Sequence, residues 1–583
     1  MSSPAELECK KLCVRRCLFA VTFGIAIQYL LLSIFLLLVN FSLLHPIQWV
    51  TETFSLVFSV YTWLKITPLI SALVLYGIFL GNSFLAVPKY YPSRFAWLCG
   101  TFLKKWVSFV LHALLGFLTA WLYAGFLSEE YNVLLRECYE GYCLNERYIF
   151  LALGGVYAGL YYFSKERFTG EPEIVFPVIQ ECKYVKIRSQ IYSVIYMSLM
   201  KSFVPVMCFV LVYWVASWTV TSRVAAVFDA EPDESFSSLT SIMLSFRLLL
   251  YTWILASQIL CNMYLLYICF IIVLTTEEHF LIEKGPALNR QEGVTIVEAL
   301  SLSKVPIAQH LASLDLFNLA TSKSSERRQQ IFSLSVPGGH PYNWNQLSGQ
   351  VLSMIDAFTD ELTQSRKTAP IQSAYFQKKL PGPMPPATLE AERILIRQYN
   401  ESFGIRNMMG SPPCRSPPPS CNMTSPAMNP CDRVNDTVEH IGQVINDACR
   451  SAFYNIPGFY YLFGEQEGAK TTFILARSQD IIWLTQALAG LCAASLTEDR
   501  FGVVQKELPV IIKSFLRLKA ELDQICNMNL NGKKLDRNCI ALRNAVKRSL
   551  YKICTVFGDY IGDLIADMDE LRRVQCYVKY LET

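Results

Sequence analysis

Cysteine and histidine residues are the groups in this chain that could do chemistry. The 583 residues include 19 cysteines and 6 histidines. The cysteines form no C-x-x-C pair and the histidines form no H-E-x-x-H pair, so zinc-ribbon, thioredoxin-like and zincin chemistry find no support. The sequence also contains no G-x-S-x-G, no G-x-G-x-x-G and no Walker A loop. We therefore expect no enzymatic activity, no cofactor and no bound metal.

Two groups of cysteines have spacings that suggest a modification. Cys138 and Cys143 lie in an acidic loop between two apolar segments. In an oxidising compartment they could form a small disulfide loop, and two free thiols are the equal alternative. Cys9, Cys13 and Cys17 recur every four residues beside the first apolar segment, on one helical face with basic neighbours. Cysteines next to a membrane are palmitoylation candidates, although unmodified thiols are the simpler interpretation.

Six long apolar segments must position these groups. A transmembrane helix needs roughly 20 apolar residues to cross about 30 Å of hydrocarbon. The segments that qualify are 18–39, 66–87, 107–127, 144–163, 203–221 and 248–274. The fourth is the weakest, because Asn145, Glu146 and Arg147 stand at its start. Only 17% of the residues are charged, against about 25% in soluble proteins, and the shortage falls before residue 275.

The positions of Lys and Arg near the ends of these segments predict the orientation. Basic clusters at 10–16, 89–105 and 165–201 fall on one side of the membrane, and acidic loops at 129–146 and 229–234 fall on the other. We therefore expect the N-terminus in the cytosol. Six crossings return the C-terminus to the same side.

The bodies of the six segments lack ionisable residues, which favours an anchor. Transporters and pumps usually keep such residues at membrane depth. His112 is the one candidate, and a hydrogen-bonded packing role is favoured over a proton relay. Gly155 and Gly159 form a G-x-x-x-G pattern, for which packing inside the bundle is favoured over self-association. The aromatic stretch 46–65 is predicted to lie along the membrane surface.

Residues after 275 have the composition of a water-facing helical domain. Proline recurs through 366–435, which predicts a mostly disordered linker. We thus predict an all-α fold, in which a six-helix transmembrane bundle is followed by a cytosolic α-helical domain interrupted by a Pro-rich disordered linker. The predicted parts are a cytosolic tail (1–17), the transmembrane domain (18–274), a helical segment (275–365), the linker (366–435) and a C-terminal helical domain (436–583).

Two long strings of residues resemble a known family. Residues 327–344 (RRQQIFSLSVPGGHPYNW) and 493–505 (AASLTEDRFGVVQ) are similar to signatures of the transmembrane nucleoporins of the nuclear division cycle (Ndc-one) family. Shorter matches stand at 45–49 (HPIQW) and 176–180 (FPVIQ). The four strings occur in the family's order and lie in both halves of the chain.

The resemblance implies a protein of the nuclear envelope that anchors the nuclear pore complex and supports pore assembly, without enzymatic activity. It implies contact with nuclear membrane lipid, with the RRM-like membrane-binding nucleoporin and with the WD-repeat nucleoporin Aladin. Direct contact with nucleic acid is not expected, because the formal charge is only +4. Whether the chain self-associates stays open.

Residues of the two long strings are predicted to shape the scaffold or its docking surface, with packing between helices as the alternative for each. They are Arg327, Arg328, Phe332, Gly338, Gly339, His340, Trp344, Glu498, Asp499, Arg500 and Phe501. Two other classes remain as alternatives for the whole chain. One is a transporter or channel of the endoplasmic reticulum, which needs a polar cavity at membrane depth. The other is a membrane-embedded acyl-transfer enzyme, which needs a His or Asp near the bilayer.

Overall fold

The computed structural model describes most of the chain. The described residues are 3–41, 44–138, 141–168, 174, 176, 182–231, 239–283, 293–334, 339–377, 459–464, 468–529, 536–558, 560–565 and 567–578. They divide into two units. The larger comprises Met1–Tyr90, Leu98–Glu361 and Phe473–Thr583, and the smaller comprises Tyr91–Trp97 and Leu362–Thr472.

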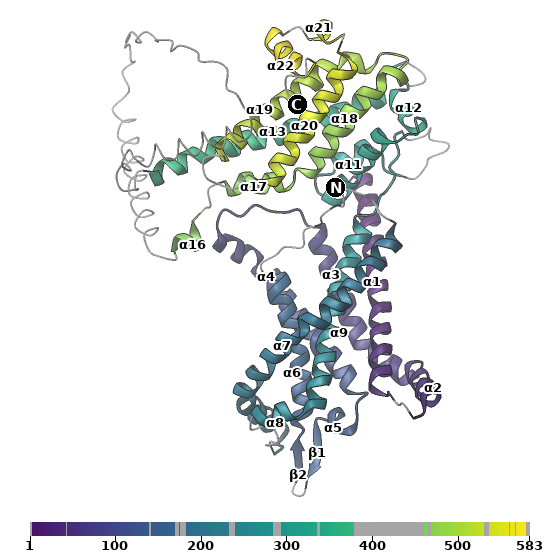
Figure 1. The fold of residues 1–583 in the computed structure, drawn as a ribbon, viewed down its shortest axis with the longest axis vertical. Coiled ribbons are helices and arrows are strands. Elements are labelled where there is room, and N and C mark those ends of the chain that lie inside the picture. The colour runs from purple at the N-terminus through teal and green to yellow at the C-terminus, as the bar shows by residue number, and fades with distance from the viewer. Residues whose placement is uncertain are drawn as a thin grey trace, which may run out of the picture. The chain divides into compact units, whose positions relative to one another are not determined.

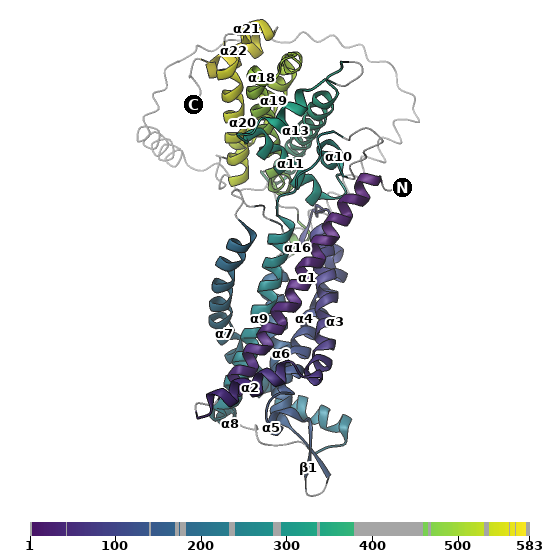
Figure 2. The same ribbon diagram turned by 90° about the vertical axis from the view of Figure 1, so that its right-hand side faces the viewer.

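The first half of the chain is almost wholly helical in its described parts (Figure 1). Its elements are α1 (Pro4–Val39), α2 (Pro46–Val57), α3 (Val60–Leu85), α4 (Arg94–Ala124), α5 (Glu129–Asn132), β1 (Leu135–Cys138), β2 (Gly141–Leu144), α6 (Glu146–Tyr162), the π-helical turn η1 (Phe163–Arg167), α7 (Lys183–Phe228), α8 (Leu239–Leu244) and α9 (Phe246–Leu274). The long helices α1, α3, α7 and α9 run side by side in two perpendicular views (Figures 1 and 2).

Six helices of the described residues are long and apolar enough to cross a membrane. They are α1, α3, α4, α7, α9 and α18 (Gln479–Glu498). Three of them, α1, α7 and α9, contain the predicted spans 18–39, 203–221 and 248–274, and α3 and α4 overlap most of the predicted spans 66–87 and 107–127. The sixth differs from the prediction, because α18 meets the criterion and α6 does not.

Helix α6, the predicted fourth span, has 17 residues, fewer than the roughly 20 of a full crossing. The turn η1 continues it by five residues, so the two together reach that length. Helix α6 packs against α7 and α9. It also crosses α4 closely, since a Cβ atom added to Gly155 would lie 2.5 Å from the carbonyl oxygen of Gly116. The G-x-x-x-G face is therefore filled from within the chain.

The acidic loop between α4 and α6 contains a β-hairpin that the all-α prediction missed. Strands β1 and β2 pair antiparallel, with Arg136 opposite Cys143 and Cys138 opposite Gly141. The backbone of Glu231 joins this hairpin from the next loop, because its carbonyl accepts from the amide of Leu144 at 2.8 Å. Four residues per strand are too few for the alternation of polar and apolar residues to be read from sequence.

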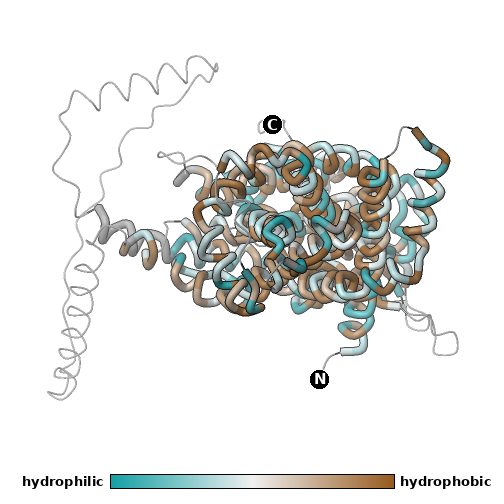
Figure 3. Tube along the Cα trace, turned by 90° about the horizontal axis from the view of Figure 1, so that it is seen from below, coloured by the Kyte–Doolittle hydropathy of each residue, from teal (hydrophilic) through white to brown (hydrophobic). Residues whose placement is uncertain are grey.

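The membrane helices carry apolar side chains on their outer faces. Exposed examples are Leu30, Leu38, Leu75, Ile78, Leu211, Val215 and Trp218. Figure 3 shows hydrophobic residues on the outward side of helices as well as between them. An apolar surface of this extent is unusual for a protein in water, but it is suited to contact with lipid.

The interior of the same helices holds uncharged polar groups. The amide nitrogen of Asn262 donates to Oε1 of Gln28 at 2.5 Å, and Nε2 of Gln28 donates to the hydroxyl of Tyr123 at 3.3 Å. His112 is fully buried, and its Nδ1 lies 2.6 Å from the carbonyl oxygen of Ser108. The two bonds of Gln28 join α1 to α9 and to α4, where lipid supplies no hydrogen-bond partner, and the bond of His112 lies within α4. The structure thus supports a packing role for His112.

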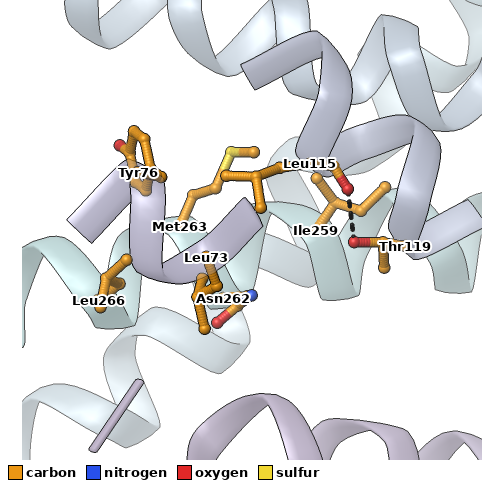
Figure 4. Close-up of a pocket in the computed structure, with 8 residues that line it drawn as sticks. All are labelled: Leu73, Tyr76, Leu115, Thr119, Ile259, Asn262, Met263 and Leu266. Atoms are coloured by element: carbon orange, nitrogen blue, oxygen red, sulfur yellow. Dashed lines mark hydrogen bonds between the residues drawn. The ribbon is translucent and has the colours of Figure 1, made fainter. Parts of the chain in front are cut away.

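A small cavity lies between α3, α4 and α9 (Figure 4). Its lining residues are Leu73, Tyr76, Leu115, Thr119, Ile259, Asn262, Met263 and Leu266. The hydroxyl of Thr119 donates to the carbonyl of Leu115 at 2.7 Å, which is the dashed line in Figure 4. Most of the lining is apolar, unlike the polar cavity at membrane depth that a transporter requires.

The second half is a bundle of helices with its own core. Its elements are α10 (Ile296–Ser301), α11 (Pro306–Thr321), α12 (Glu326–Phe332), α13 (Tyr342–Gln377), α17 (Ala469–Ala476), α18 (Gln479–Glu498), the 3₁₀ turn η3 (Val504–Lys506), α19 (Leu508–Asn529), α20 (Arg537–Val556), α21 (Ile561–Leu564) and α22 (Met568–Val578). Helix α18 packs against α11 and α20, and α19 packs against α20.

The core of this bundle is formed by apolar stripes along its helices. Phe515 of α19 and Leu550 of α20 are fully buried, as are Leu484 and Leu491 of α18. Helix α20 is amphipathic, with polar residues covering its other face. Helix α18 packs against α11 and α20 and therefore lies in the core of this bundle.

The first residues of the predicted linker are part of a helix. Helix α13 continues to Gln377, so residues 366–377 are helical in the structure. The remainder of the predicted linker, 378–435, lies outside the described residues.

The smaller unit joins the start of α4 to the aromatic helix α16 (Phe459–Phe463). The guanidinium of Arg94 lies 3.7 Å above the ring centre of Tyr461. The ring centres of Phe95 and Phe463 are 4.6 Å apart. This unusually aromatic stretch is thus partly covered by residues of α4, while Tyr461 remains exposed.

Candidate functional site

The candidate site is the junction where the membrane helices meet the helical domain. Arg16 lies in α1, two residues before the first predicted span, and only 8% of it is exposed. Its guanidinium donates to the carbonyls of Leu274 at 3.1 Å and Thr276 at 2.7 Å, and it pairs with the Glu278 carboxylate at 2.6 Å. Carbonyls at a helix C-terminus lack partners within the helix. Arg16 therefore caps α9 and fixes the first residues that leave the membrane.

The next residues of the chain are held by a buried carboxylate. The side chain of Asp315, in α11, is 1% exposed. It accepts the backbone amide of Phe280 at 3.0 Å and two bonds from the guanidinium of Arg327 at 2.7 and 2.6 Å. Nδ1 of His279 lies 3.2 Å from the same carboxylate. Forked pairs between arginine and carboxylate are strong and directional, so this group joins the segment after α9 to α11 and α12.

Arg328 makes a second forked pair, which links α12 to α18. It donates to the two carboxylate oxygens of Glu498 at 2.8 and 2.5 Å, and to the carbonyl of Ser322 at 2.7 Å. The hydrogen bonds to Glu498 raise the pKa of Arg328 above its ordinary value. Two predicted residues from strings far apart in sequence therefore meet, and their role in the structure is packing between helices.

The rest of the first string forms a corner beside α13. Phe332 and Trp344 are buried, with ring centres 5.9 Å apart. Gly339 has a φ of 66°, a left-handed conformation that favours glycine. His340 follows it on the exposed side of the corner, and Gly338 lies outside the described residues.

The second string ends α18 in a tight turn that presents an aromatic side chain. The carboxylate of Asp499 accepts the backbone amides of Phe501 and Val504, each at 3.0 Å. Gly502 has a φ of 64°, which completes the turn. Arg500 is exposed, and 61% of Phe501 is exposed. Of the predicted site residues, Phe501 therefore has the geometry of a docking residue.

Sequence reasoning missed a buried ion pair between α11 and α18. Nδ1 of His310 lies 3.0 Å from the Asp480 carboxylate. The ring of His310 stacks on Phe176, and Phe176 meets Trp483 edge-on. Phe176 belongs to the short FPVIQ string, so this match marks a contact between the loop after α6 and the helical domain. A lone histidine with a partner 170 residues away gives no signal in a single sequence.

The groups around His310 shift the pKa of its side chain. Burial opposes the charged form, but the Asp480 carboxylate and the carbonyl of Pro306 outweigh it, so the pKa of His310 is raised above 6.5. Nearby Arg477 acts in the opposite direction.

The cysteines predicted to be modified have contrasting environments. Cys143 is disulfide-bonded, whereas the side chain of Cys138 lies outside the described residues. Cys9 and Cys13 are free and buried, and Cys17 is free and half-buried. A thiol that is buried against neighbouring helices cannot carry an acyl chain without leaving them, so this packing does not favour palmitoylation at Cys9 or Cys13.

Within the described ranges, no group of three or more His, Cys, Asp or Glu side chains could hold a metal ion.

The architecture and the junction define a class of protein: a multi-pass membrane protein whose lipid-facing helices carry a helical scaffold. A family model described as nucleoporin protein Ndc1-Nup matches residues 11–575. The chain belongs to this Ndc1 nucleoporin family, and it is a transmembrane protein of the nuclear pore complex.

Curated relatives agree over nearly the whole chain. Nucleoporin Ndc1 of Drosophila pseudoobscura pseudoobscura is 39% identical and covers 98% of each chain. Nucleoporin Ndc1 of Drosophila melanogaster is 38% identical over 98% of this chain and 99% of its own. Nucleoporin NDC1 of Homo sapiens is 25% identical over 94% of each chain.

Replacing the buried carboxylate tests the junction. We expect Asp315→Asn to lower the free energy of unfolding by about 2–3 kcal/mol, because Arg327 loses a charged partner. Asp360→Asn is the matched control, since Asp360 pairs with Arg517 at the surface and should contribute less than about 1 kcal/mol. Chemical denaturation of the purified protein measures both. Equal effects of the two substitutions would contradict the account.

The raised pKa of His310 predicts a pH dependence. The folded pKa lies above the unfolded value of 6.5, so the ion pair stabilises fully below pH 6.5, and its contribution is lost as the pH rises through the folded pKa. We expect wild type to exceed His310→Gln in stability at pH 6 and this difference to shrink toward pH 8.5. Thermal unfolding across this range measures it, and a difference that grows with pH would refute the assignment.

Proposed function

We propose that the chain anchors the nuclear pore complex in the nuclear envelope and supports pore assembly. In this proposal α1, α3, α4, α6, α7 and α9 cross the membrane, and the helical domain docks soluble nucleoporins in the cytosol. The observation that carries the proposal is the junction at Arg16 and Asp315. It bonds the end of the last membrane helix to both α1 and the domain, so a partner bound to the domain is tied to the bilayer.

The dimensions of α1 support this arrangement. It has 36 residues, about 54 Å at 1.5 Å per residue, so it is longer than the hydrocarbon is thick. Beyond the predicted span its first turns pack against α10 and α11. One continuous helix therefore belongs to both the membrane bundle and the domain. Six lipid-embedded helices make the attachment effectively irreversible.

The orientation follows from charge and from the disulfide. Disulfides persist in oxidising compartments and are rare in the cytosol. Cys143 is disulfide-bonded, and Cys138 stands two residues beyond Arg136, the strand partner of Cys143. We propose that these two cysteines form one bond in the lumen of the envelope. The termini are then on the cytosolic or pore side.

For partners we propose the RRM-like membrane-binding nucleoporin and the WD-repeat nucleoporin Aladin, following the family resemblance. Exposed aromatic side chains often dominate interfaces between proteins, and Phe501 is presented by a rigid turn. Several partners that are themselves tied to the membrane need only modest individual affinities, because the effective concentration is high. We propose no catalytic role, and the apolar lining of the cavity in Figure 4 does not favour a transporter.

Substitution of Phe501 tests docking. We expect Phe501→Ala to weaken recovery of soluble nucleoporins about tenfold, which corresponds to about 1.4 kcal/mol, without changing the melting temperature. Tyr560→Ala is the matched control, because Tyr560 is equally exposed and lies outside the family strings. Pull-down from nuclear extract measures recovery. Identical recovery with both variants would remove Phe501 from the docking surface.

Glycosylation tests the orientation. The second half of the chain carries sequons at Asn400, Asn422 and Asn435, and we expect none of them to carry a glycan, because this proposal places them in the cytosol. Asp233→Asn creates the sequon Asn-Glu-Ser in the predicted lumenal loop, and it should add one glycan. Glycosidase treatment followed by electrophoresis distinguishes the forms. A glycan at Asn400, Asn422 or Asn435 would overturn the proposed topology, whereas a glycan at the sequon Asn40-Phe41-Ser42, at the lumenal end of α1, would agree with it.

A further inference from the structure

Two buried thiols meet at one end of the helical domain. The sulfur atoms of Cys526 in α19 and Cys539 in α20 are 3.0 Å apart. Both cysteines are free, and they are 3% and 0% exposed. The separation is shorter than an ordinary contact between two sulfur atoms. The two helices thus hold the thiols so close together that oxidation to a disulfide requires only a small movement of the sulfur atoms.

The pair stands at helix ends, where opening is least costly. Cys526 is three residues before the end of α19 at Asn529, and Cys539 is in the first turn of α20, which begins at Arg537. Helix ends open locally with lower free energies than helix centres. A small oxidant can therefore reach these sulfur atoms without unfolding the domain.

Two features near the pair stabilise the thiolate form of the cysteines, and burial opposes it. The positive end of a helix stabilises a thiolate in its first turn, and this is where Cys539 lies. The guanidinium of Arg543 interacts electrostatically with both sulfur atoms, although the Asp523 carboxylate at 2.5 Å shares its charge. Burial acts the other way and raises the pKa of Cys539. We expect reaction on opening of the helix ends and not in the closed state.

We propose that Cys526 and Cys539 are a redox modification site that forms a reversible disulfide between α19 and α20 when a peroxide is present. One thiolate attacks the peroxide, its sulfur becomes a sulfenic acid, and the peroxide oxygen that leaves departs as water. The second thiol then displaces the hydroxyl of the sulfenic acid as a second water, and the S–S bond forms. Two thiols lose two electrons and two protons in total, and one peroxide is reduced to two waters.

The bond would close a short loop of the chain. The two cysteines are 13 residues apart, so the disulfide fixes the connection between α19 and α20. In the cytosol the glutathione pool reduces disulfides that it can reach, and the same opening of the helix ends gives it access to this pair. The site would therefore report oxidation and return to thiols, unlike the lumenal disulfide of Cys143.

Peptide mapping of the full chain in lipid nanodiscs tests the proposal. The protein is treated with hydrogen peroxide, free thiols are blocked with N-ethylmaleimide in denaturant, and peptides are analysed before and after dithiothreitol. We expect a linked peptide of Cys526 and Cys539 at an occupancy at least about tenfold above any disulfide of Cys492 or Cys554, which are buried single thiols. Dithiothreitol should remove the linked peptide.

Variants separate the pair from general oxidation. Cys526→Ser should leave Cys539 without a disulfide, and Cys554→Ser should leave the linked peptide unchanged. Because Cys526→Ser could misfold, the wild-type map decides by itself. Equal maleimide labelling of Cys526, Cys539 and Cys554 after peroxide would overturn the proposal.

Discussion

The whole arrangement depends on how the chain leaves the membrane after α9. A helix that ends at a bilayer surface leaves carbonyl groups without partners, and the chain beyond it is free to swing. Here Arg16 caps those carbonyls, and the Asp315 carboxylate holds the amide of Phe280 six residues past the helix end. Both contacts are buried, so water competes little with them. The membrane helices and the domain are consequently joined by directional bonds.

The membrane half obeys a different rule from the domain. In lipid the hydrophobic effect does not drive helices to associate, so close approach of their backbones and polar contacts must hold them together. The crossing of Gly116 and Gly155 supplies the first, and the amides of Gln28 and Asn262 supply the second. These groups carry no charge, which suits an anchor better than a route for ions. The domain, by contrast, buries apolar stripes and uses forked ion pairs to fix the ends of its helices.

Much of the helical pattern could be predicted, because it depends on local periodicity. The apolar runs of the sequence predicted α1, α3, α4, α7 and α9. Apolar residues such as Phe515 and Leu550 also recur at helical spacing, and they are buried. What sequence could not supply were contacts between distant residues, such as Arg328 with Glu498 or His310 with Asp480. Composition also could not separate α18, a buried core helix, from α6, which is shorter but lies among the membrane helices. The β-hairpin was not predicted, because its strands are too short to show an alternation of polar and apolar residues.

The family strings were informative in an uneven way. Most of the residues predicted from them bind other parts of the same chain. Arg327, Arg328 and Trp344 stabilise the scaffold, while Phe501 is turned outward. A residue of a family string can thus stabilise the fold that presents a binding surface, without itself being part of that surface.

Hydrogen exchange of the segment after α9 tests the central claim most directly. In the full chain in lipid nanodiscs, the amides of Phe280 and Leu281 are bonded to Asp315 and to the carbonyl of Val294. The account predicts that they exchange as slowly as the amides of α11, because all belong to one joint. Rapid exchange at Phe280 and Leu281, with α11 still protected, would show a flexible tether and contradict the account.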